Sequence, residues 1–324
     1  MSEGLAFCGF KLKYRLMNLV VIRRFLTLLA LSNLHRAFAA TIVLQPVADT
    51  TLIEAMPTNN MGGTAFVNAG TSGEGKRNRG LYKFDFSSIP PDSKIKSASV
   101  TLEVVAEPSA GGTSSTFGLY RMLKSWGEGN KVSTELQPGF GLPATTNEAT
   151  WNSRFAFTTN NWTSPGASND FTATISSSTQ VYGVADFPHF ASTPQIIADV
   201  QVWVNDSSSN FGWMLKSESE STLKTARRFG SREFAGEDTG SPPFVEVEFI
   251  PPPPVFGLQI TNNQFKFSFG AESNQAYQVE YKNALLSTNA WLNVTNISAS
   301  AAATNILISD PISSSTRFYR VIPQ

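Results

Sequence analysis

Residues 96–105, KSASVTLEVV, decide how the first two thirds of this chain are interpreted. Every second residue from Ala98 to Val104 is apolar, so an extended strand here would place its apolar side chains on one face. Similar short runs recur along residues 41–250 and are separated by turn signals such as Ile89-Pro90-Pro91-Asp92. The pattern predicts a domain built from antiparallel strands.

Short alternating runs of this kind continue to the end of the chain. The predicted strands are Thr41–Val47, Ala65–Asn68, Leu81–Phe86, Lys96–Val105, Thr116–Met122, Phe171–Ser176, Phe211–Lys216, Phe244–Ile250, Phe265–Phe269, Tyr277–Tyr281, Trp291–Asn296, Ile306–Ile308 and Arg317–Ile322. The segment Gln195–Asn205 fits a strand or a short helix. A high aromatic content, with 24 Phe among 324 residues, also favours strands.

Four consecutive prolines, Pro251–Pro254, divide the chain, because such a run forms a short, stiff, extended spacer. We therefore expect an all-β protein with two domains. Residues 41–250 are predicted to form a β-sandwich of jelly-roll type, and residues 255–324 a smaller β-sandwich.

Residues 1–39 have the organisation of a secretory signal peptide, with Met17 as an alternative start. The basic pair Arg23-Arg24 precedes the apolar run Phe25–Leu31, and Ala37-Phe38-Ala39 supplies a small-residue cleavage motif. The apolar run is too short to span a bilayer, and no later segment is long and apolar enough to do so. We expect a secreted or cell-surface protein with no membrane span after cleavage.

Cleavage would also change the chemistry of the chain. The segment holds six of the 25 basic and one of the 25 acidic residues, which leaves 19 basic and 24 acidic residues and a net charge of −5. This balance argues against nucleic-acid binding. The remaining chain has no cysteine and one histidine, His189, which excludes disulfides and Cys/His zinc sites. Asp49 and Asp85, with Glu54 and Asp238, could supply oxygen ligands for calcium.

The long segment Leu123–Asp170 has little periodicity but contains Trp126, Trp151 and Trp162. A sugar ring stacks its apolar face on an aromatic plate while its hydroxyls need polar neighbours, such as Glu128 beside Trp126. These residues are therefore candidates for carbohydrate binding. The alternative is that the tryptophans cover the core and are not exposed to solvent.

Two basic clusters occur in an otherwise acidic domain: Lys76/Arg77/Arg79 and Lys224/Arg227/Arg228/Arg232. Guanidinium groups bind carboxylates with two parallel hydrogen bonds, so Arg228 and Arg232 are candidates for contacts with an acidic polysaccharide. The alternative is that these side chains form ordinary surface ion pairs. Neither His189 nor any carboxylate lies in a recognisable catalytic motif.

Several short motifs between residues 43 and 250 resemble the DNRLRE domain family. They are Asp49-Thr50-Thr51, Asn60-Met61-Gly62-Gly63, Arg79–Pro90, Ala98–Leu102, Ser125–Gly129, Ala149–Asn152, Trp162 with Pro165-Gly166, Phe211–Lys216 and Arg228–Glu233. The resemblance implies a secreted jelly-roll module, some of whose relatives bind alginate beside a polysaccharide lyase, although no lyase motif is visible here. The tail, through Tyr277–Tyr281, Trp291, Asp310 and Arg317–Val321, resembles short fibronectin type III-like domains, which implies spacing or surface attachment.

These observations together predict a secreted, non-catalytic protein that binds a polysaccharide, with an acidic glycan such as alginate as the expected ligand. The residues expected to carry this function are Trp126, Glu128, Trp151, Trp162, Arg228 and Arg232. The alternative is a structural or adhesive surface protein with no glycan ligand, in which the C-terminal domain contacts surface partners.

Overall fold

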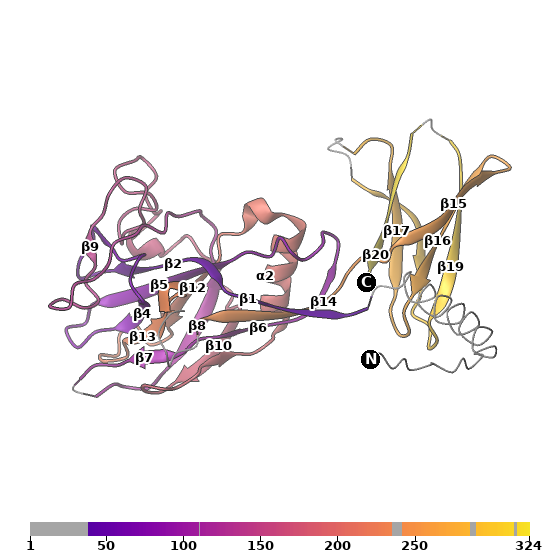
Figure 1. The fold of residues 1–324 in the computed structure, drawn as a ribbon. Helices are drawn as coiled ribbons and strands as arrows, with labels where there is room; N and C mark the ends of the chain where they lie inside the picture. The colour runs from indigo at the N-terminus through magenta and orange to yellow at the C-terminus, as the bar shows by residue number, and fades with distance from the viewer. Residues whose placement is uncertain (1–37, 110, 235–241, 286–289, 314–315) are drawn as a thin grey trace, which may run out of the picture. The chain divides into compact units, whose positions relative to one another are not determined.

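The structure is a computed structural model that describes residues 38–109, 111–234, 242–285, 290–313 and 316–324. The signal-peptide prediction for residues 1–39 lies outside the described residues, apart from its last two positions. The all-β prediction is confirmed, because antiparallel strands form almost all of the regular structure. The described chain separates into two compact units, Ala39–Pro252 and Pro253–Ile322 (Figure 1).

The first unit contains fourteen strands and a single α-helix within the described residues. They are β1 (Ala40–Leu44), β2 (Pro46–Ile53), β3 (Asn59–Asn60), β4 (Phe66–Thr71), β5 (Arg77–Phe84), β6 (Lys94–Thr101), β7 (Val104–Ala106), β8 (Ser115–Arg121), β9 (Leu142–Pro143), β10 (Ser177–Val181), β11 (His189–Phe190), α2 (Pro194–Asn205), β12 (Trp213–Ser217), β13 (Arg227–Gly230) and β14 (Phe244–Ile250).

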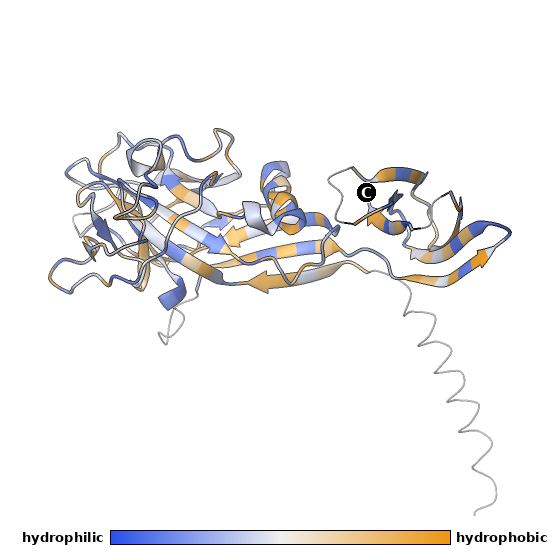
Figure 2. Cartoon of the chain, turned by 90° about the horizontal axis from the view of Figure 1, so that it is seen from above, coloured by the Kyte–Doolittle hydropathy of each residue, from blue (hydrophilic) through white to orange (hydrophobic). Residues whose placement is uncertain are grey.

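Two antiparallel sheets enclose the main core of this unit. One has the order β1-β14-β6-β11, and the other has the order β10-β8-β12-β5-β4-β13-β7 with β2 also paired to β5. In the first sheet, Val245 and Val247 of β14 lie opposite Val100 and Ala98 of β6, so the alternation seen in the sequence becomes one apolar face. Figure 2 shows hydrophobic and hydrophilic residues alternating along these strands.

A second apolar cluster lies on the other face of the larger sheet. Leu52, Leu81, Tyr120 and Met214 project from β2, β5, β8 and β12 into this cluster. Residues 123–170 cover it with large apolar side chains. The long segment without periodicity is therefore a covering layer of the sheet, held in place by a core of its own.

The segment Gln195–Asn205 lies within the helix α2. Thr193 caps this helix by accepting a hydrogen bond from the Ile196 amide, at 3.1 Å, and Pro194 follows at the first helical position. Trp203 then packs at the centre of the main core, 4.6 Å from Trp213 between ring centroids. The predicted strand Phe171–Ser176 is wrong, because only Phe171 forms a bridge and β10 begins at Ser177.

The second unit contains six strands within its described residues. They are β15 (Val255–Thr261), β16 (Gln264–Ala271), β17 (Tyr277–Lys282), β18 (Leu292–Ile297), β19 (Thr304–Pro311) and β20 (Phe318–Pro323). They form two three-stranded sheets, β15-β16-β19 and β18-β17-β20. Phe267 and Phe269 of one sheet and Tyr277 and Val279 of the other bury their side chains in the core between them.

Candidate functional site

Two of the three candidate tryptophans are buried under the covering segment. The side chains of Trp151 and Trp162 are only 4% and 5% exposed and belong to the second apolar cluster. The Trp162 indole nitrogen donates to the Thr150 carbonyl at 2.8 Å, and Gly166 approaches the Trp151 ring so closely that a Cβ there would lie 2.6 Å from it. The prediction that they form a sugar platform is wrong, because neither ring is exposed for a sugar to stack on. Both rings instead cover the apolar face of the larger sheet, which stabilises the fold by removing that face from water.

Trp126 has a similar role at the edge of the same cluster. Its side chain is partly buried against the cluster, and its indole nitrogen donates to the Phe211 carbonyl at 2.8 Å. This hydrogen bond joins the covering segment to the strand region that it covers. Trp126 is therefore part of the packing between the segment and the sheet.

Three other predicted residues, Asp49, Glu128 and Arg232, meet in one cluster. Arg232 forms a two-pronged ion pair with Glu128, with Nε–Oε1 and Nη2–Oε2 distances of 2.7 and 3.1 Å. The Arg232 amide donates to Asp49 at 2.7 Å, and the Asp49 amide donates to Glu128 at 3.0 Å. Glu233 also lies 3.0 Å from the Arg232 guanidinium. Arg232 thus binds carboxylates of its own chain, which corrects its assignment to a glycan.

The cluster brings together the buried carboxyl group of Asp49 and the partly buried one of Glu128. Burial raises the pKa of Asp49 well above its usual range, against the opposing effect of the hydrogen bond from the Arg232 amide. Burial likewise raises the pKa of Glu128, although the Asp49 amide and Arg232 favour its charged form. The cluster therefore joins β2 to residues 128 and 232 at the cost of desolvating two carboxyl groups.

The calcium prediction is not supported by the arrangement of Asp49 and Asp85. Asp85 is exposed beyond the end of β5, where its carboxylate accepts hydrogen bonds from the Ser87 amide and hydroxyl, both at 2.9 Å. Asp49 instead faces Arg232, and Asp238 lies outside the described residues. Among the described residues, no group of three or more acidic, histidine or cysteine side chains could hold a metal ion.

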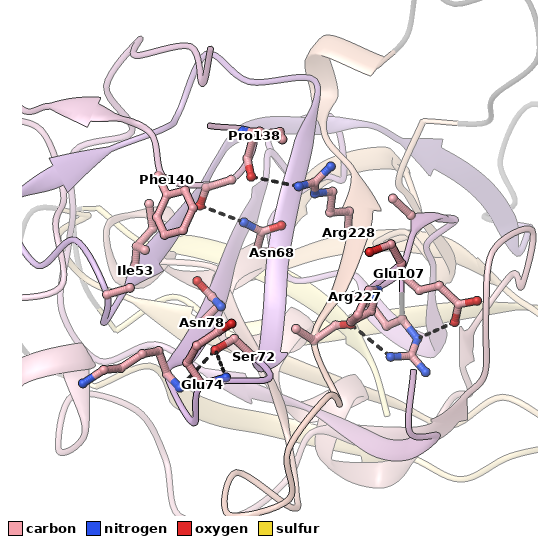
Figure 3. Close-up of a pocket in the computed structure, with 17 residues that line it drawn as sticks. Ile53, Asn68, Ser72, Glu74, Asn78, Glu107, Pro138, Phe140, Arg227 and Arg228 are labelled. Carbon is pink, nitrogen blue, oxygen red and sulfur yellow. Dashed lines mark hydrogen bonds and ion pairs between the residues drawn. The ribbon is translucent and has the colours of Figure 1, made fainter. Parts of the chain in front are cut away.

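Arg228, the remaining candidate, lines a groove with a volume of about 480 Å³ on the larger sheet (Figure 3). Arg228 of β13 lies directly opposite Asn68 of β4 in the register, so both side chains project from the same face of the sheet. Its Nη2 donates to the Pro138 carbonyl at 2.8 Å, and its guanidinium lies 4.5 Å above the Phe66 ring. Asn68 Nδ2 donates to the Gly139 carbonyl at 3.2 Å.

Arg228 differs from other arginines of the two basic clusters in its lack of a carboxylate partner among the described residues. Arg77 pairs with Glu54 and Arg79 with Glu220, each at 2.7 Å, and Arg227 lies 3.8 Å from Glu107. Within the described part of the chain, no carboxylate pairs with Arg228. Burial alone lowers its pKa, yet an arginine starts so high that the side chain stays charged at neutral pH.

The rest of the groove combines amides, charges and one aromatic ring. Asn68 and Asn78 project from β4 and β5, and Phe140 lies on the rim with 38% of its surface exposed. Figure 3 shows Asn68 and Arg228 pointing toward the segment of Pro138 and Phe140, with Arg227 and Glu107 grouped apart from them. Cations, amides and an aromatic plate in one concave surface suit a ligand that is hydroxylated, anionic and partly apolar.

The sequence interpretation found Arg228 but not Asn68, Asn78 or Phe140. Asn68 closes the predicted strand Ala65–Asn68, yet no motif shows which neighbour it faces. No family model and no curated protein matches the chain. No helix in the described ranges is long and apolar enough to cross a bilayer.

Proposed function

We propose that this chain is a secreted or cell-surface, non-catalytic protein that binds an acidic polysaccharide such as alginate in the groove containing Arg228. The observation that carries the proposal is a half-buried guanidinium in a concave surface with no carboxylate partner among the described residues. Such a group gains most from an incoming carboxylate, because its partial burial strengthens a charge-assisted hydrogen bond. Secretion is supported by the signal-peptide pattern of residues 1–39.

The other lining groups support the same ligand class. Asn78 carries both a carbonyl acceptor and an NH2 donor, which match sugar hydroxyls. Asn68 is buried and its Nδ2 already donates to the Gly139 carbonyl, so it positions the rim of the groove. Phe140 offers an exposed ring for the apolar face of a pyranose. Glu107 lies near Arg227, away from Arg228, so it does not neutralise the proposed carboxylate site.

The test is affinity electrophoresis of the full chain in gels containing alginate, pectin or a neutral glucan. We expect an acidic glycan to retard the wild-type chain, and Arg228→Gln to weaken binding about 10-fold or more, since a hydrogen bond to a charged group is lost. Arg228→Lys should retain part of the affinity, because it keeps the charge but loses the two-pronged geometry.

Arg154→Gln is a matched control for this experiment. Arg154 also donates to a loop carbonyl, that of Ser125 at 2.9 Å, and also lies over an aromatic ring, at 5.6 Å from Phe155. Its removal should leave glycan retardation unchanged. Equal retardation of wild type and Arg228→Gln by an acidic glycan would refute the role of the groove.

The burial of Trp151 and Trp162 favours a second candidate, a structural or adhesive surface protein. In that case the tryptophans serve only to pack the covering segment, and the groove has no glycan ligand. Unchanged migration of the wild-type chain across the whole panel of glycans would favour this candidate.

A further inference from the structure

The first strand of the second unit, β15, lies at the edge of its sheet. It pairs with β16, and no other strand of the described chain lies beside it. Val255, Leu258 and Ile260 are 48%, 63% and 71% exposed, although β15 is part of a sandwich whose other strands bury apolar residues. An apolar edge strand of this kind is a template for pairing with another strand.

A groove of about 250 Å³ runs beneath this edge, within the second unit. Val255 and Leu258 of β15 line one side, and Phe318 and Tyr319 of β20 line the other. Phe267 of the core lies beneath this groove but is only 1% exposed, so the groove is a depression over a closed core. A strand added beside β15 would place side chains over this depression.

Two edge strands of the second unit, β15 (VFGLQIT) and β18 (LNVTNI), carry no charged residue and no proline, and β15 is the more apolar of the two. β18 has one exposed large apolar residue, Leu292, against three in β15. β19 carries Asp310 and Pro311, and β20 carries Arg320. Charges and prolines protect edge strands, because a strand pairing with its own copy across a two-fold axis sets like charges close together. β15 lacks this protection.

We propose that β15 pairs antiparallel with β15 of a second copy of this chain. The strand is self-complementary in one register, which sets Val255 opposite Ile260 of the second copy, and Gly257 opposite Leu258. The irregularity between residues 256 and 259 lies at the centre of this register, so it meets its own counterpart. Apolar side chains then oppose apolar side chains, and the small Gly257 leaves room for the larger Leu258. The proposal is independent of glycan binding.

Sedimentation velocity of the purified full chain over a range of concentrations tests the proposal. We expect a concentration-dependent dimer, with Ile260→Lys weakening dimerisation at least about 10-fold, because the variant sets a lysine into the shared apolar edge of both copies. Leu307→Lys is the matched control: Leu307 lies on β19, at the opposite edge of the sheet, and is 61% exposed. It should dimerise like the wild type.

Cysteine cross-linking tests the register. In a Cys8→Ser background, which removes the chain's only cysteine, the double variant Val255→Cys/Ile260→Cys should form a covalent dimer on mild oxidation. The double variant Leu307→Cys/Ser309→Cys on the opposite edge should give little cross-linked product. A monomeric wild type at concentrations of about 100 μM, or a dimer that Ile260→Lys leaves intact, would overturn the proposal.

Discussion

Glu54, close to the end of β2, is a carboxylate whose surroundings strongly favour its charged form. Arg77 donates to it three times: through Nη2 at 2.7 Å, through Nε at 3.0 Å and through its backbone amide at 2.8 Å. Chiefly through the side-chain bonds, Arg77 lowers the pKa of Glu54 to about 2, against the raising effect of burial. The folded chain therefore binds a proton at Glu54 less readily than the unfolded chain does.

This difference makes Glu54→Gln a test at the residue scale. The stabilisation by Glu54 is fully present above its unfolded pKa of about 4.5 and disappears as the pH falls toward 2. Glu54→Gln should therefore cost about 1–3 kcal/mol of unfolding free energy at pH 7, reduced by the partial exposure of Arg77, and almost nothing near pH 2. Urea unfolding between pH 2 and 7 measures the difference.

The exposed Glu246 of β14 supplies the control. Glu246→Gln removes an exposed carboxylate and should change the unfolding free energy at pH 7 by no more than about 0.5 kcal/mol. A loss of stability in Glu54→Gln that is equal at pH 7 and pH 2 would show that the Glu54–Arg77 ion pair does not cause it.

The contacts of two single residues also show why the candidate site could be predicted only in part. Arg228 and Arg232 lie four positions apart and are indistinguishable by residue type. Their roles differ because Arg232 meets Glu128, 104 residues away in the sequence, whereas Arg228 meets the Pro138 carbonyl. Contacts over such separations depend on the register of the larger sheet, which local patterns do not contain.

At the scale of elements, the helix α2 is fixed by a buried carboxylate on its inner face. Asp199 is fully buried and accepts hydrogen bonds from the Ser176 hydroxyl and, at 3.0 Å, from the Trp213 indole nitrogen. Gln195 donates to it from the same helix at 3.0 Å, and Arg121 of β8 lies 3.4 Å away. The helix is thus joined to β8, β12 and the residue before β10.

Replacing Asp199 should therefore loosen α2 from the sheet. We expect Asp199→Ala to cost about 2–4 kcal/mol of unfolding free energy, because it leaves the Trp213 donor and the Arg121 charge without their buried partner. Asp199→Asn should cost less, since it keeps an acceptor oxygen for Trp213. Thermal and urea unfolding measure both variants, and a cost below about 1 kcal/mol for Asp199→Ala would contradict this account.

The same scale shows how far periodicity predicts structure. Strands with one buried face, such as β6, were predicted because their alternation extends over several residues. The predicted strand Lys96–Val105 is nevertheless wrong in its extent, because β6 ends at Thr101 and Val104 begins β7 in the larger sheet, a change of sheet that the unbroken alternation does not reveal. The pair β3 and β9 has only two residues in each strand, too few for any period. Gln195–Asn205 stayed ambiguous because its apolar residues fit both periods. Thr193 and Pro194, two residues and one residue before it, are the start signal that identifies a helix.

At the scale of the whole molecule, the two units have separate cores. The pattern within one strand does not reveal how strands from distant segments combine into sheets. The larger sheet joins β2 to β13 through pairings that span much of the first unit. The all-β class follows from alternation alone, whereas the covering of the larger sheet by residues 123–170 depends on tertiary packing. The burial of the tryptophans could therefore not be separated from a sugar platform in the sequence.

Separate cores predict separate unfolding of the two units. Phe267 is buried in the core of the second unit, and Phe267→Ala should cost about 3–5 kcal/mol there and lower the melting temperature of this unit by more than about 10 °C. Five of the six tryptophans lie in the first unit, so tryptophan fluorescence should report an unchanged transition. Circular dichroism, which detects both units, should show the lowered one.

Phe117→Ala in the core of the first unit should give the reverse result, with a shifted fluorescence transition.

The second unit should also melt in a concentration-dependent way, because pairing through β15 would stabilise only the folded form of that unit. Its melting temperature should therefore rise with protein concentration in the wild type and stay constant in Ile260→Lys, while the fluorescence transition does not depend on concentration in either protein. If Phe267→Ala lowered the melting temperatures of both transitions together, the units would unfold as one. The stability of the groove containing Arg228 would then depend on the second unit.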